Sequence, residues 1–364
     1  MGIWGCKNYI NCSEDDDDLD TIQIRKLKLI GDGAFGRVWA ANIKEIKGTR
    51  LSDTGYNKHN PGTERLSKEK TVYAIKEMNK AIILAQGVDV LANWEVAILK
   101  MIPKCDFIVN LWEAFQDKNS AYLLMDYVPW GDLQFHMKTL NKQKRLQGLS
   151  GGTFTENEAR FIVVWILEAL RVVHKSGIIH RDIKPDNIIM DSNGYAKLAD
   201  FGVAELQKNT KKGNQLGTYS YMAPEIIYGD KYSYQADFYS LGVLLSLMVT
   251  GHMDIGNDIS EAKINISMRR KFLTTEKFCK LYPEISFEWN DLIVQLLAEY
   301  PSHRIGTNNG VDEILSHEWF SKIEINQIKS QEMQSPIINI VTNSKNIKKL
   351  THVSDHAFEN QWEK

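Results

Sequence analysis

The first third of the chain carries short runs of apolar, β-branched and aromatic residues that are typical of strands. Two such runs lie within residues 21–40, on either side of a glycine-rich stretch, and a third lies at residues 71–77. Between them, residues 43–70 hold Lys, Asn, Gly, Pro and Ser with little apolar periodicity. We therefore expect strands at 21–40 and 71–77, separated by a long, mobile insertion at 43–70.

The remaining two thirds of the chain are mostly helical in period. Apolar residues recur with helical spacing at residues 81–102, 156–174, 239–250 and 289–297. Thr155 stands just before the stretch 156–174, and Glu158 lies three residues after Thr155. The two residues therefore fit a capping box. Another short apolar run, Tyr122 to Val128, predicts a strand. The pattern indicates an α+β protein whose polar, poorly periodic residues 321–364 form a tail laid on the surface.

Composition narrows the class of protein. The chain has 364 residues, enough for about two domains or one large bilobed unit. Its 43% hydrophobic and 25% charged residues are ordinary for a globular protein, and no apolar stretch reaches the ~20 residues that a transmembrane helix needs. A net charge of -2 argues against a nucleic-acid partner. The four cysteines show no paired metal spacing and no disulfide framework, which favours a reducing, cytoplasmic setting.

The amino terminus leaves two interpretations open. Gly2 follows Met1 as in an N-myristoylation site, but the sixth position holds Cys6 where that motif has Ser or Thr. Acyl chains on Gly2 and Cys6 would together anchor the protein at a membrane surface. Alternatively, the segment is a plain solvated leader, continuous with the acidic run at residues 13–20.

A glycine-rich stretch is the first candidate for chemistry. Residues 30–38 read IGDGAFGRV, with glycines at Gly31, Gly33 and Gly36. Glycines let the backbone approach a polyphosphate and point amides at it. The GxGxxG pattern alone is weak, because dinucleotide-binding folds have it between a strand and a helix. Here it lies between two predicted strands, which is the arrangement of protein kinases.

A lysine and a glutamate form the second candidate. Lys76 ends the strand Tyr73-Ala74-Ile75-Lys76, and Glu95 lies within the next predicted helix, beside apolar neighbours. A charge on that inward face is costly unless it is paired. We therefore expect Lys76 and Glu95 to form an ion pair, rather than two unrelated surface charges.

The most specific string is HRDIKPDN at residues 180–187. Asp200-Phe201-Gly202 follows it, and Ala223-Pro224-Glu225 follows in turn. Together with the glycine-rich stretch and Lys76, these make five motifs in one order, for which coincidence is negligible.

By these residues the chain resembles the eukaryotic protein kinases over roughly residues 25–320. Lys184 in HRDIKPDN, and Gly217-Thr218 ahead of Ala223-Pro224-Glu225, resemble the serine/threonine branch. The string from Phe107 to Leu133 is similar to the AGC group and, within it, to YANK-type kinases; Gly2 and residues 355–359 point the same way.

The resemblance implies a bilobal kinase fold. It divides the chain into a leader at 1–20, a kinase domain at 21–320 and the tail at 321–364. Within the domain, a β-rich N-lobe at 21–128 carries the insertion, and a helical C-lobe covers 129–320. The implied activity is transfer of the γ-phosphoryl group of ATP to Ser and Thr hydroxyls of protein substrates, by a monomer that uses Mg²⁺.

Roles for the site residues also come from the resemblance. Asp182 would be the catalytic base, Lys184 would neutralise charge on the transferred group, and Asn187 and Asp200 would hold Mg²⁺. Lys76, oriented by Glu95, would grip the α- and β-phosphates. The residues expected to bind the nucleotide are Ile30, Gly31, Asp32, Gly33, Ala34, Phe35, Gly36, Arg37, Val38, Ala74, Lys76, Met125, Asp126, Val128, Asp132 and Ile189.

Structural roles follow in the same way. Leu99, Leu111, His180 and Phe201 resemble a stacked spine anchored by Asp237. Glu225 and Arg304 resemble a buried ion pair of the large lobe.

Three departures from the pattern change what we expect. Asn214 occupies the place where many AGC kinases carry a phosphorylated threonine, and Glu205 stands where a phosphate-binding residue is common; an acid there would repel a phosphate. We therefore expect activity without phosphorylation at that place. Phe358 and Trp362 do not form the usual hydrophobic motif of the tail. Leu247 replaces an acid of the peptide groove, so Asp132 and Asp186 predict only a moderate preference for Arg or Lys before the target residue.

Two other functions are alternatives to an active serine/threonine protein kinase. A pseudokinase acting as a scaffold would be expected to lack Lys76, Asp182 or Asp200, and all three are present. A small-molecule kinase on a related fold is disfavoured by the Ala223-Pro224-Glu225 segment and by Gly217-Thr218, which favour a peptide groove.

Overall fold

The structure is a computed structural model, and it describes part of the chain. The described residues are 7–8, 22–33, 36–46, 72–85, 89–147, 152–210, 215–251, 258, 260–264, 266, 280 and 282–343. Contacts divide the chain into two compact units, which are described separately. Unit 1 comprises Met1–Ala97, Val109–Trp130 and Thr342–Lys364, and unit 2 comprises Ile98–Ile108 and Gly131–Val341. No helix among the described residues could cross a lipid bilayer.

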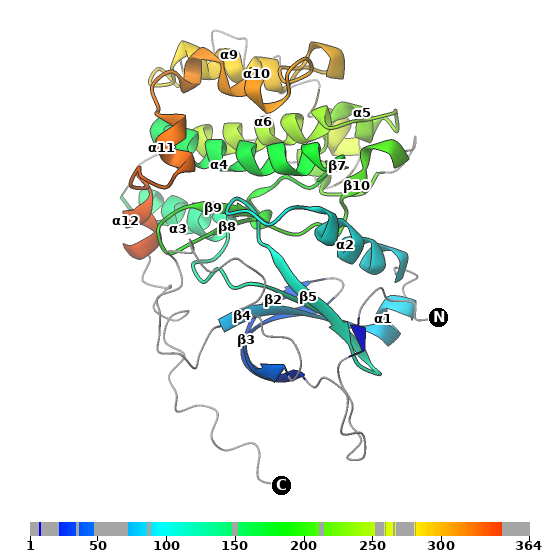
Figure 1. The fold of residues 1–364 in the computed structure, drawn as a ribbon. Coiled ribbons are helices and arrows are strands. Elements are labelled where there is room, and N and C mark those ends of the chain that lie inside the picture. The colour runs from blue at the N-terminus through cyan, green and yellow to red at the C-terminus, as the bar shows by residue number, and fades with distance from the viewer. Residues whose placement is uncertain are drawn as a thin grey trace, which may run out of the picture. The chain divides into compact units, whose positions relative to one another are not determined.

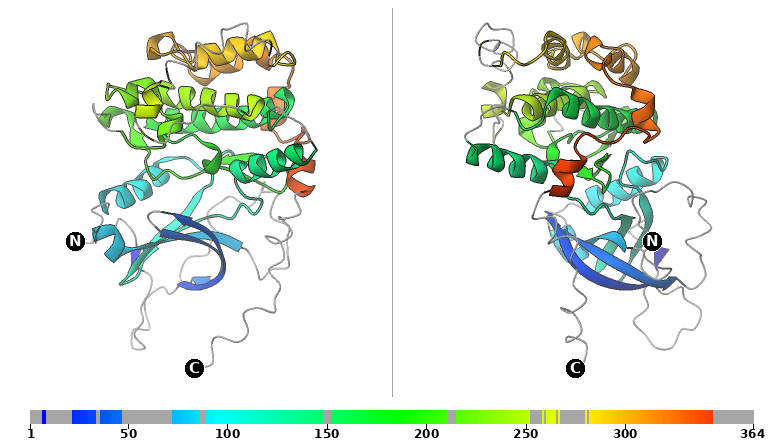
Figure 2. Two further views of the ribbon diagram at one scale, coloured as in Figure 1. Left: turned by 180° about the vertical axis from the view of Figure 1, so that it is seen from behind. Right: turned by 90° about the vertical axis from the view of Figure 1, so that its left-hand side faces the viewer.

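Unit 1 is built on a six-stranded sheet (Figure 1). Its strands are β1 (Lys7–Asn8), β2 (Ile22–Gly33), β3 (Gly36–Ile46), β4 (Val72–Asn79), β5 (Leu111–Gln116) and β6 (Ser120–Asp126). The order across the sheet is β1-β5-β6-β4-β3-β2. Neighbours from β5 to β2 are antiparallel, and β1 joins β5 in parallel. The expected strands are therefore present, and Figure 2 shows the strong twist of β2 and β3.

The sheet buries one apolar face. Ala41, Ile75, Phe115, Tyr122 and Leu124 form a core cluster, four of them with no exposed surface. These positions lie on adjacent strands, so the cluster links β3, β4, β5 and β6 across the sheet.

The insertion begins later than the sequence pattern suggests. β3 continues to Ile46, within the range 43–70 that we expected to be irregular. Ile43 pairs with Ile24 of β2 and packs against the core cluster, so burial of an isolated β-branched residue extends the strand. The rest of the range, residues 47–70, lies outside the described residues.

The single helix expected at 81–102 is instead two. α1 spans Lys80–Ala85 and α2 spans Asp89–Met101. α1 begins where the side chain of Asn79 accepts hydrogen bonds from the amides of Ala81 and Ile82, which satisfies two unpaired amides of the first turn. The apolar periodicity spans both helices, so it did not reveal the break.

Unit 2 is mainly helical, and its longest helix is buried along most of its length. The helices are α3 (Leu133–Leu146), α4 (Glu156–Lys175), α5 (Pro224–Ile227), α6 (Gln235–Thr250), α9 (Phe287–Leu296), α10 (Val311–Leu315), α11 (Ile325–Lys329) and α12 (Ile338–Asn343), which extends two residues beyond the unit. Every residue of α4 from Ala159 to Leu170 is buried. α4 packs against α6, and α6 packs against α9, so the helices form layers (Figures 1 and 2).

The start of α4 follows the predicted signal. The Thr155 hydroxyl accepts a hydrogen bond from the Glu158 amide, while the Glu158 carboxylate accepts one from the Thr155 amide at 2.7 Å. The capping box is therefore confirmed, and it fixes where the central helix of the unit begins.

Two pairs of short strands lie next to the motif-bearing loops of unit 2. β7 (Ile178–Ile179) pairs antiparallel with β10 (Glu205–Leu206), and β8 (Ile188–Met190) pairs antiparallel with β9 (Ala196–Leu198). The HRDIKPDN string lies between β7 and β8, and Asp200 follows β9. The β7–β10 pair and the β8–β9 hairpin therefore flank HRDIKPDN and Asp200.

Part of the tail belongs to the core. We expected residues 321–364 to lie on the surface, but Ile328 of α11 has no exposed surface and Ile337 is 1% exposed. The Ser335 hydroxyl donates to the Gly194 carbonyl at 2.8 Å, between β8 and β9. The two buried isoleucines are too widely spaced to give a helical or strand period, which is why the pattern missed them. Residues 344–364 lie outside the described residues.

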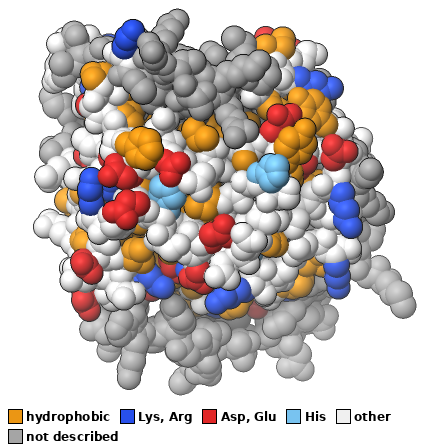
Figure 3. All heavy atoms as spheres, turned by 90° about the horizontal axis from the view of Figure 1, so that it is seen from above, with side chains coloured by type: hydrophobic (Ala, Val, Ile, Leu, Met, Phe, Trp, Pro, Cys, Tyr) orange, Lys and Arg blue, Asp and Glu red, His pale blue; other side chains and the backbone are white. Residues whose placement is uncertain are grey.

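The surface seen from the side of α9 and α10 is of mixed charge. Figure 3 shows acidic, basic and hydrophobic side chains interspersed over the described part of this face. Exposed aromatic residues of unit 2 include Phe287, which is 80% exposed, and Tyr300, which is 64% exposed.

Candidate active site

The glycine-rich stretch covers the end of β2 and the start of β3 in unit 1. Gly31 pairs with Val38, Asp32 with Arg37, and Gly33 with Gly36. Only a glycine fits at Gly36, because a Cβ there would lie 2.1 Å from the Glu77 carbonyl oxygen of β4. Ala34 and Phe35 lie outside the described residues, while Ile30 lies within β2. The glycines thus lie between two strands, as the sequence predicts.

Lys76 and Glu95 form the expected ion pair within unit 1. The Lys76 Nζ lies 2.7 Å and 2.8 Å from the two carboxylate oxygens of Glu95. Glu95 is 4% exposed, and the Lys76 side chain is 13% exposed. The buried carboxylate of Glu95 on α2 is thus paired with the ammonium group of Lys76 on β4.

The other predicted nucleotide-binding residues of unit 1 lie on β4, β6 and the segment after it. Ala74 is buried and pairs with Ala40 and Met125. The Asp126 carboxylate accepts hydrogen bonds from Asn110 and Trp112, so its side chain is engaged within the unit. For Asp126 and Val128 the backbone groups therefore remain the candidates for adenine binding.

In unit 2, Asp182 is oriented by four hydrogen-bond donors. Its Oδ1 accepts from the hydroxyl and the amide of Thr218, at 2.7 Å and 3.0 Å. Its Oδ2 lies 3.0 Å from Asn187 Nδ2 and 2.8 Å from Lys184 Nζ. Lys184 Nζ also donates to the Thr218 hydroxyl at 2.9 Å. These four contacts fix the orientation of the Asp182 carboxylate, which is the geometric requirement for a group that accepts a proton in a reaction.

Asp237 is hydrogen-bonded to the backbone of the loop that carries Asp182. The Asp237 carboxylate accepts from the amides of His180 and Arg181 at 2.9 Å and 2.8 Å, and from His174 Nε2 at 2.8 Å. Complete burial acts to raise the pKa of Asp237, but its hydrogen bonds and nearby charges hold the pKa below the usual value. Asp237 is thus a buried anion that fixes the backbone just before Asp182.

His180 is neutral and has one tautomer in this arrangement. Burial lowers its pKa below the ordinary value of 6.5. Its Nδ1 accepts from the Asp182 amide at 3.3 Å, so Nε2 carries the proton and donates to the Ala199 carbonyl at 3.2 Å. The ring also contacts Phe201 edge to face, with centroids 4.9 Å apart. Two members of the predicted spine, together with Asp237, are therefore in contact or hydrogen-bonded to one another.

The two expected metal-binding residues differ in how they are held. Because Asn187 Nδ2 donates to Asp182, the Asn187 amide oxygen is the atom available to a cation. Asp200 is exposed, has a φ of 60° and accepts from the Gly202 amide. The Ala199 amide donates to the Asn187 carbonyl at 2.9 Å, which ties the two segments together.

The donor chemistry suits Mg²⁺ rather than a softer ion. No group of three or more His, Cys, Asp or Glu side chains among the described residues could hold a metal. One amide oxygen and one carboxylate are hard ligands, and Mg²⁺ typically completes such a partial set with phosphate oxygens and water. Asn187 and Asp200 thus fit a metal that arrives with a phosphorylated substrate.

Asp132 and Ile189 lie side by side in unit 2. They form an isolated antiparallel bridge, and Asp132 also caps α3 by accepting from the Phe135 amide at 2.7 Å. Burial raises the pKa of Asp132, and the charge of Asp186 adds to this effect. The two acids that we expect near a peptide substrate are therefore electrostatically coupled.

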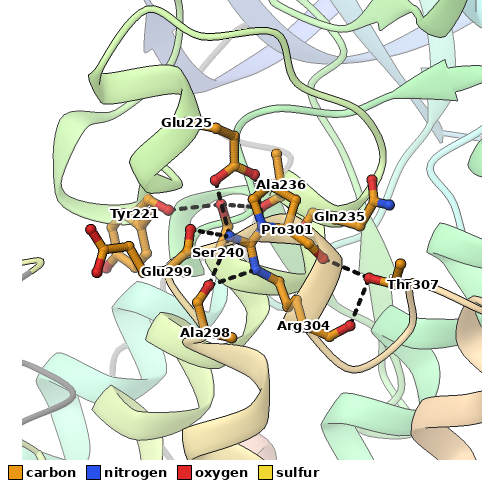
Figure 4. A network of polar contacts seen from close by, with 10 residues as sticks. All are labelled: Tyr221, Glu225, Gln235, Ala236, Ser240, Ala298, Glu299, Pro301, Arg304 and Thr307. Atoms are coloured by element: carbon orange, nitrogen blue, oxygen red, sulfur yellow. Dashed lines mark hydrogen bonds and ion pairs between the residues drawn. The ribbon is translucent and has the colours of Figure 1, made fainter.

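A buried ion pair links distant parts of unit 2 (Figure 4). Arg304 donates to both carboxylate oxygens of Glu225, at 2.7 Å and 3.0 Å, and also to the carbonyls of Ala298 and Gln235. Arg304 is 1% and Glu225 5% exposed. The predicted pair is present, and its additional hydrogen bonds satisfy the buried guanidinium.

Comparison with known proteins decides the family. The model of the protein kinase domain matches residues 63–320. The chain belongs to the protein kinase family. Its curated relatives include the serine/threonine-protein kinase AtPK2/AtPK19 of Arabidopsis thaliana, 33% identical over 312 residues. That match covers 85% of this chain and 57% of the relative, so the chain spans little more than half of it.

Other relatives of the chain are also named as protein kinases. A putative ribosomal protein S6 kinase alpha-1 of Caenorhabditis elegans is 32% identical over 326 residues, covering 87% of this chain and 36% of the relative. The eye isozyme of protein kinase C from Drosophila melanogaster is 30% identical over 326 residues, covering 88% and 40%. These agree with the expected AGC group, while the finer YANK-type assignment stays a prediction.

Sequence reasoning missed the contacts that three residues make with the kinase motifs. Thr218 was noted only as a branch marker, yet it makes two hydrogen bonds to Asp182. Glu205 and Tyr232 both contact the Arg181 guanidinium. Arg181 in HRDIKPDN was one available signal, because a buried arginine needs partners; Glu205 was noted only as an acid that would repel a phosphate. Asn214, Phe358 and Trp362 lie outside the described residues.

Proposed function

We propose that this kinase transfers the γ-phosphoryl group of ATP to Ser and Thr hydroxyls of protein substrates. The arrangement of Asp182 supports this most directly. Its carboxylate is oriented by Asn187, Lys184 and Thr218, which suits a base that accepts the hydroxyl proton as the oxygen attacks phosphorus. The names of the relatives support the serine/threonine class.

Each unit has its own part in the proposed reaction. In unit 1, the turn of residues 30–38 and the Glu95-oriented Lys76 would bind the nucleotide phosphates. In unit 2, Lys184 would offset negative charge on the phosphoryl group during transfer. Mg²⁺, when bound by Asn187 and Asp200, would supply charge neutralisation at the phosphates. ADP leaves, and the proton from the substrate hydroxyl ends on Asp182.

Replacing Asp182 tests the proposal. We expect Asp182→Asn to lower kcat by at least about a hundredfold, because general-base catalysis contributes on the order of 10²–10⁴-fold. Nucleotide affinity, measured by calorimetry with ATP and Mg²⁺, should change little, since Asn keeps the shape of the side chain. Transfer of radiolabelled phosphate to generic protein substrates measures the rate. The matched control is Glu332→Gln, an exposed residue of the same unit, which should keep full activity.

Two results would contradict the proposal. Equal activity of the wild type and Asp182→Asn would remove Asp182 from catalysis. Labelling of a metabolite without labelling of protein would instead favour a small-molecule kinase.

The proposal extends to the amino terminus and the assembly state. Gly2 and Cys6, which lie outside the described residues, are the positions at which acylation would attach the kinase to a membrane; a plain leader is the alternative. The intact mass of the protein from its native cells distinguishes the two.

Because one chain carries every group that the reaction uses, we propose that the kinase acts as a monomer. Its four cysteines without paired spacing support a reducing, cytoplasmic setting.

A further inference from the structure

Unit 2 contains an open cavity that the proposed reaction does not use. Its volume is about 670 Å³, within the roughly 300–1,000 Å³ of typical ligand pockets. Its described walls are the end of α2, residues 176–177, residues 206–208 and 210, and residues 231–233. All of these belong to unit 2, and none is a residue to which we assign nucleotide binding, metal binding or proton transfer. We call this space the β10 cavity, because Leu206 of β10 lines it.

The β10 cavity is positively charged. Its described lining includes Lys208 and Lys231 but no Asp or Glu. Both lysines are exposed, and neither ammonium group has a hydrogen bond or an ion pair with another residue that the structure describes. Two such groups beside one cavity raise the local concentration of anions, and each offers three hydrogen-bond donors to an oxyanion.

A hydroxyl group adds a neutral donor to the lysines. The Ser233 hydroxyl accepts a hydrogen bond from Gln207 Nε2 at 2.9 Å, so its own proton is available to a ligand. The hydroxyls of Ser176 and Thr210 already donate, to the Val172 and Gln207 carbonyls at 2.9 Å and 3.1 Å. Ser233 therefore complements the two lysines as a donor for a bound anion.

The β10 cavity also has an apolar wall. Met101, the last residue of α2, is 49% exposed, and Leu206 lies in the same lining. Tyr232 contributes its ring, because its hydroxyl is already bonded to Arg181 and Glu205. A methionine side chain adapts to the shape of a neighbour, and contact with an apolar ligand would remove Met101 from water.

We propose that the β10 cavity binds a small amphipathic oxyanion. Its phosphate or carboxylate head lies at Lys208, Lys231 and Ser233. Its apolar body lies against Met101 and Leu206. An inorganic ion would leave the apolar wall in water, and an uncharged molecule would leave both ammonium groups without a partner. The volume of the cavity likewise suits an organic molecule rather than a single ion.

A bound ligand would join walls that already contact one another. The Gln207 amide donates to the Gly177 carbonyl at 2.8 Å, and the Gln207 side chain donates to Ser233. A ligand that binds only the folded protein stabilises it increasingly as its concentration exceeds the dissociation constant. Binding at the β10 cavity is therefore measurable without any assay of phosphoryl transfer.

The experiment uses the intact chain and phenyl phosphate as the probe, at constant ionic strength. Methionine labelled with ¹³C in its methyl group reports the place of binding by NMR, and the Met101 signal is assigned by its loss in Met101→Gln. Calorimetry gives the dissociation constant. We expect the Met101 signal to move, with a dissociation constant of about 1 mM or below, which is usual for a probe of this size.

Related probes separate the contributions of charge and apolar contact. Benzoate, which carries a carboxylate head, should also move the Met101 signal. Benzyl alcohol lacks the charge, benzylamine reverses it, and inorganic phosphate lacks the apolar body. Each of these three should bind at least about tenfold more weakly than phenyl phosphate, the ratio that loss of one hydrogen bond to a charged group gives.

Substitutions test the two parts of the β10 cavity separately. Lys208→Gln and Lys231→Gln should each weaken phenyl phosphate binding about tenfold and leave benzyl alcohol binding unchanged. Met101→Gln should weaken phenyl phosphate binding and leave the affinity for inorganic phosphate unchanged. Lys322→Gln removes an exposed lysine elsewhere in unit 2, so this control should match the wild type. Unfolding midpoints without probe confirm that each variant is folded.

The results that would overturn the inference are distinct. A Met101 signal that stays in place at millimolar phenyl phosphate is one, and equal affinity of the wild type and both lysine variants is another. Loss of the signal change on adding ATP and Mg²⁺ would place the probe in the nucleotide site. Equal affinity for inorganic phosphate would indicate a simple ion site.

A phosphotyrosine peptide that binds more tightly than phenyl phosphate would make a protein segment the occupant, and would overturn the assignment to a small molecule. None of these measurements depends on phosphoryl transfer. The proposed kinase function and the ligand of the β10 cavity are therefore tested independently.

Discussion

The buried carboxylates at and below the loop of residues 180–187 in unit 2 are each matched by several partners. Asp237, fully buried, accepts from His174 and from the two amides before Asp182. Asp182 itself has four donors. Removing any one of these hydrogen-bond donors should lower the stability of the fold, because the carboxylate stays buried without its partner. It also leaves little freedom in where the Asp182 oxygens point, which is the property that a general base needs.

The titration of His180 gives a prediction at this scale. Its pKa is lowered in the folded protein, so the unfolded chain binds a proton below about pH 6.5 while the folded one stays neutral. The free energy of unfolding should therefore fall as pH decreases from 6.5 to 5.5, with a slope of up to about 1.4 kcal/mol per pH unit. Denaturant titrations at several pH values measure this slope.

His180→Gln removes the titrating group and keeps a polar side chain, so its stability should depend less on pH in that window. His303→Gln is the matched control, because His303 is exposed and its replacement should leave the slope unchanged. The pKa of Asp237 is lowered, so Asp237 titrates below this window and does not contribute to the slope. An identical slope in the wild type and His180→Gln would show that His180 is not held neutral by burial.

Helices and strands were predictable where a local signal accompanied the periodicity. α4 had both a capping box and a continuous apolar pattern, and it starts at the predicted residue. The stretch at 81–102 had the period alone, and it is divided into α1 and α2. The far end of β3 depends on pairing with β2 and on burial of Ile43. Contacts of that kind come from tertiary structure and leave little trace in a single sequence.

The capping box of α4 can be tested by removing its hydroxyl. Thr155→Ala loses the acceptor for the Glu158 amide, and we expect it to lower the free energy of unfolding by about 0.5–2 kcal/mol. Thr155→Ser keeps a hydroxyl at the same position and should restore most of the difference. Denaturant unfolding of both variants gives the comparison. Equal stability of Thr155→Ala and the wild type would mean that packing alone sets the start of α4.

Over the whole molecule, the motif residues could be read from the sequence, but their partners could not. Glycine spacing, Lys76 and the HRDIKPDN string carry the kinase resemblance, and the family comparison agrees with it. The partners of Asp182 and Arg181 include Thr218 and Tyr232, which lie 36 and 51 residues away along the chain. Only the fold brings such residues together. The same holds for the tail, whose polar composition concealed two buried isoleucines.

The tail provides the last prediction, because it lies beyond the matched kinase domain and yet contributes to the core of unit 2. The family match ends at residue 320, whereas Ile328 has no exposed surface and α11 packs against α4. Ile328→Ala should lower the free energy of unfolding by about 2–5 kcal/mol, the usual cost of emptying a buried site. Gln327→Ala, an exposed neighbour on the same helix, should change it by less than about 0.5 kcal/mol. If both variants were as stable as the wild type, the segment would be a surface tail, and the domain would end where the family match does.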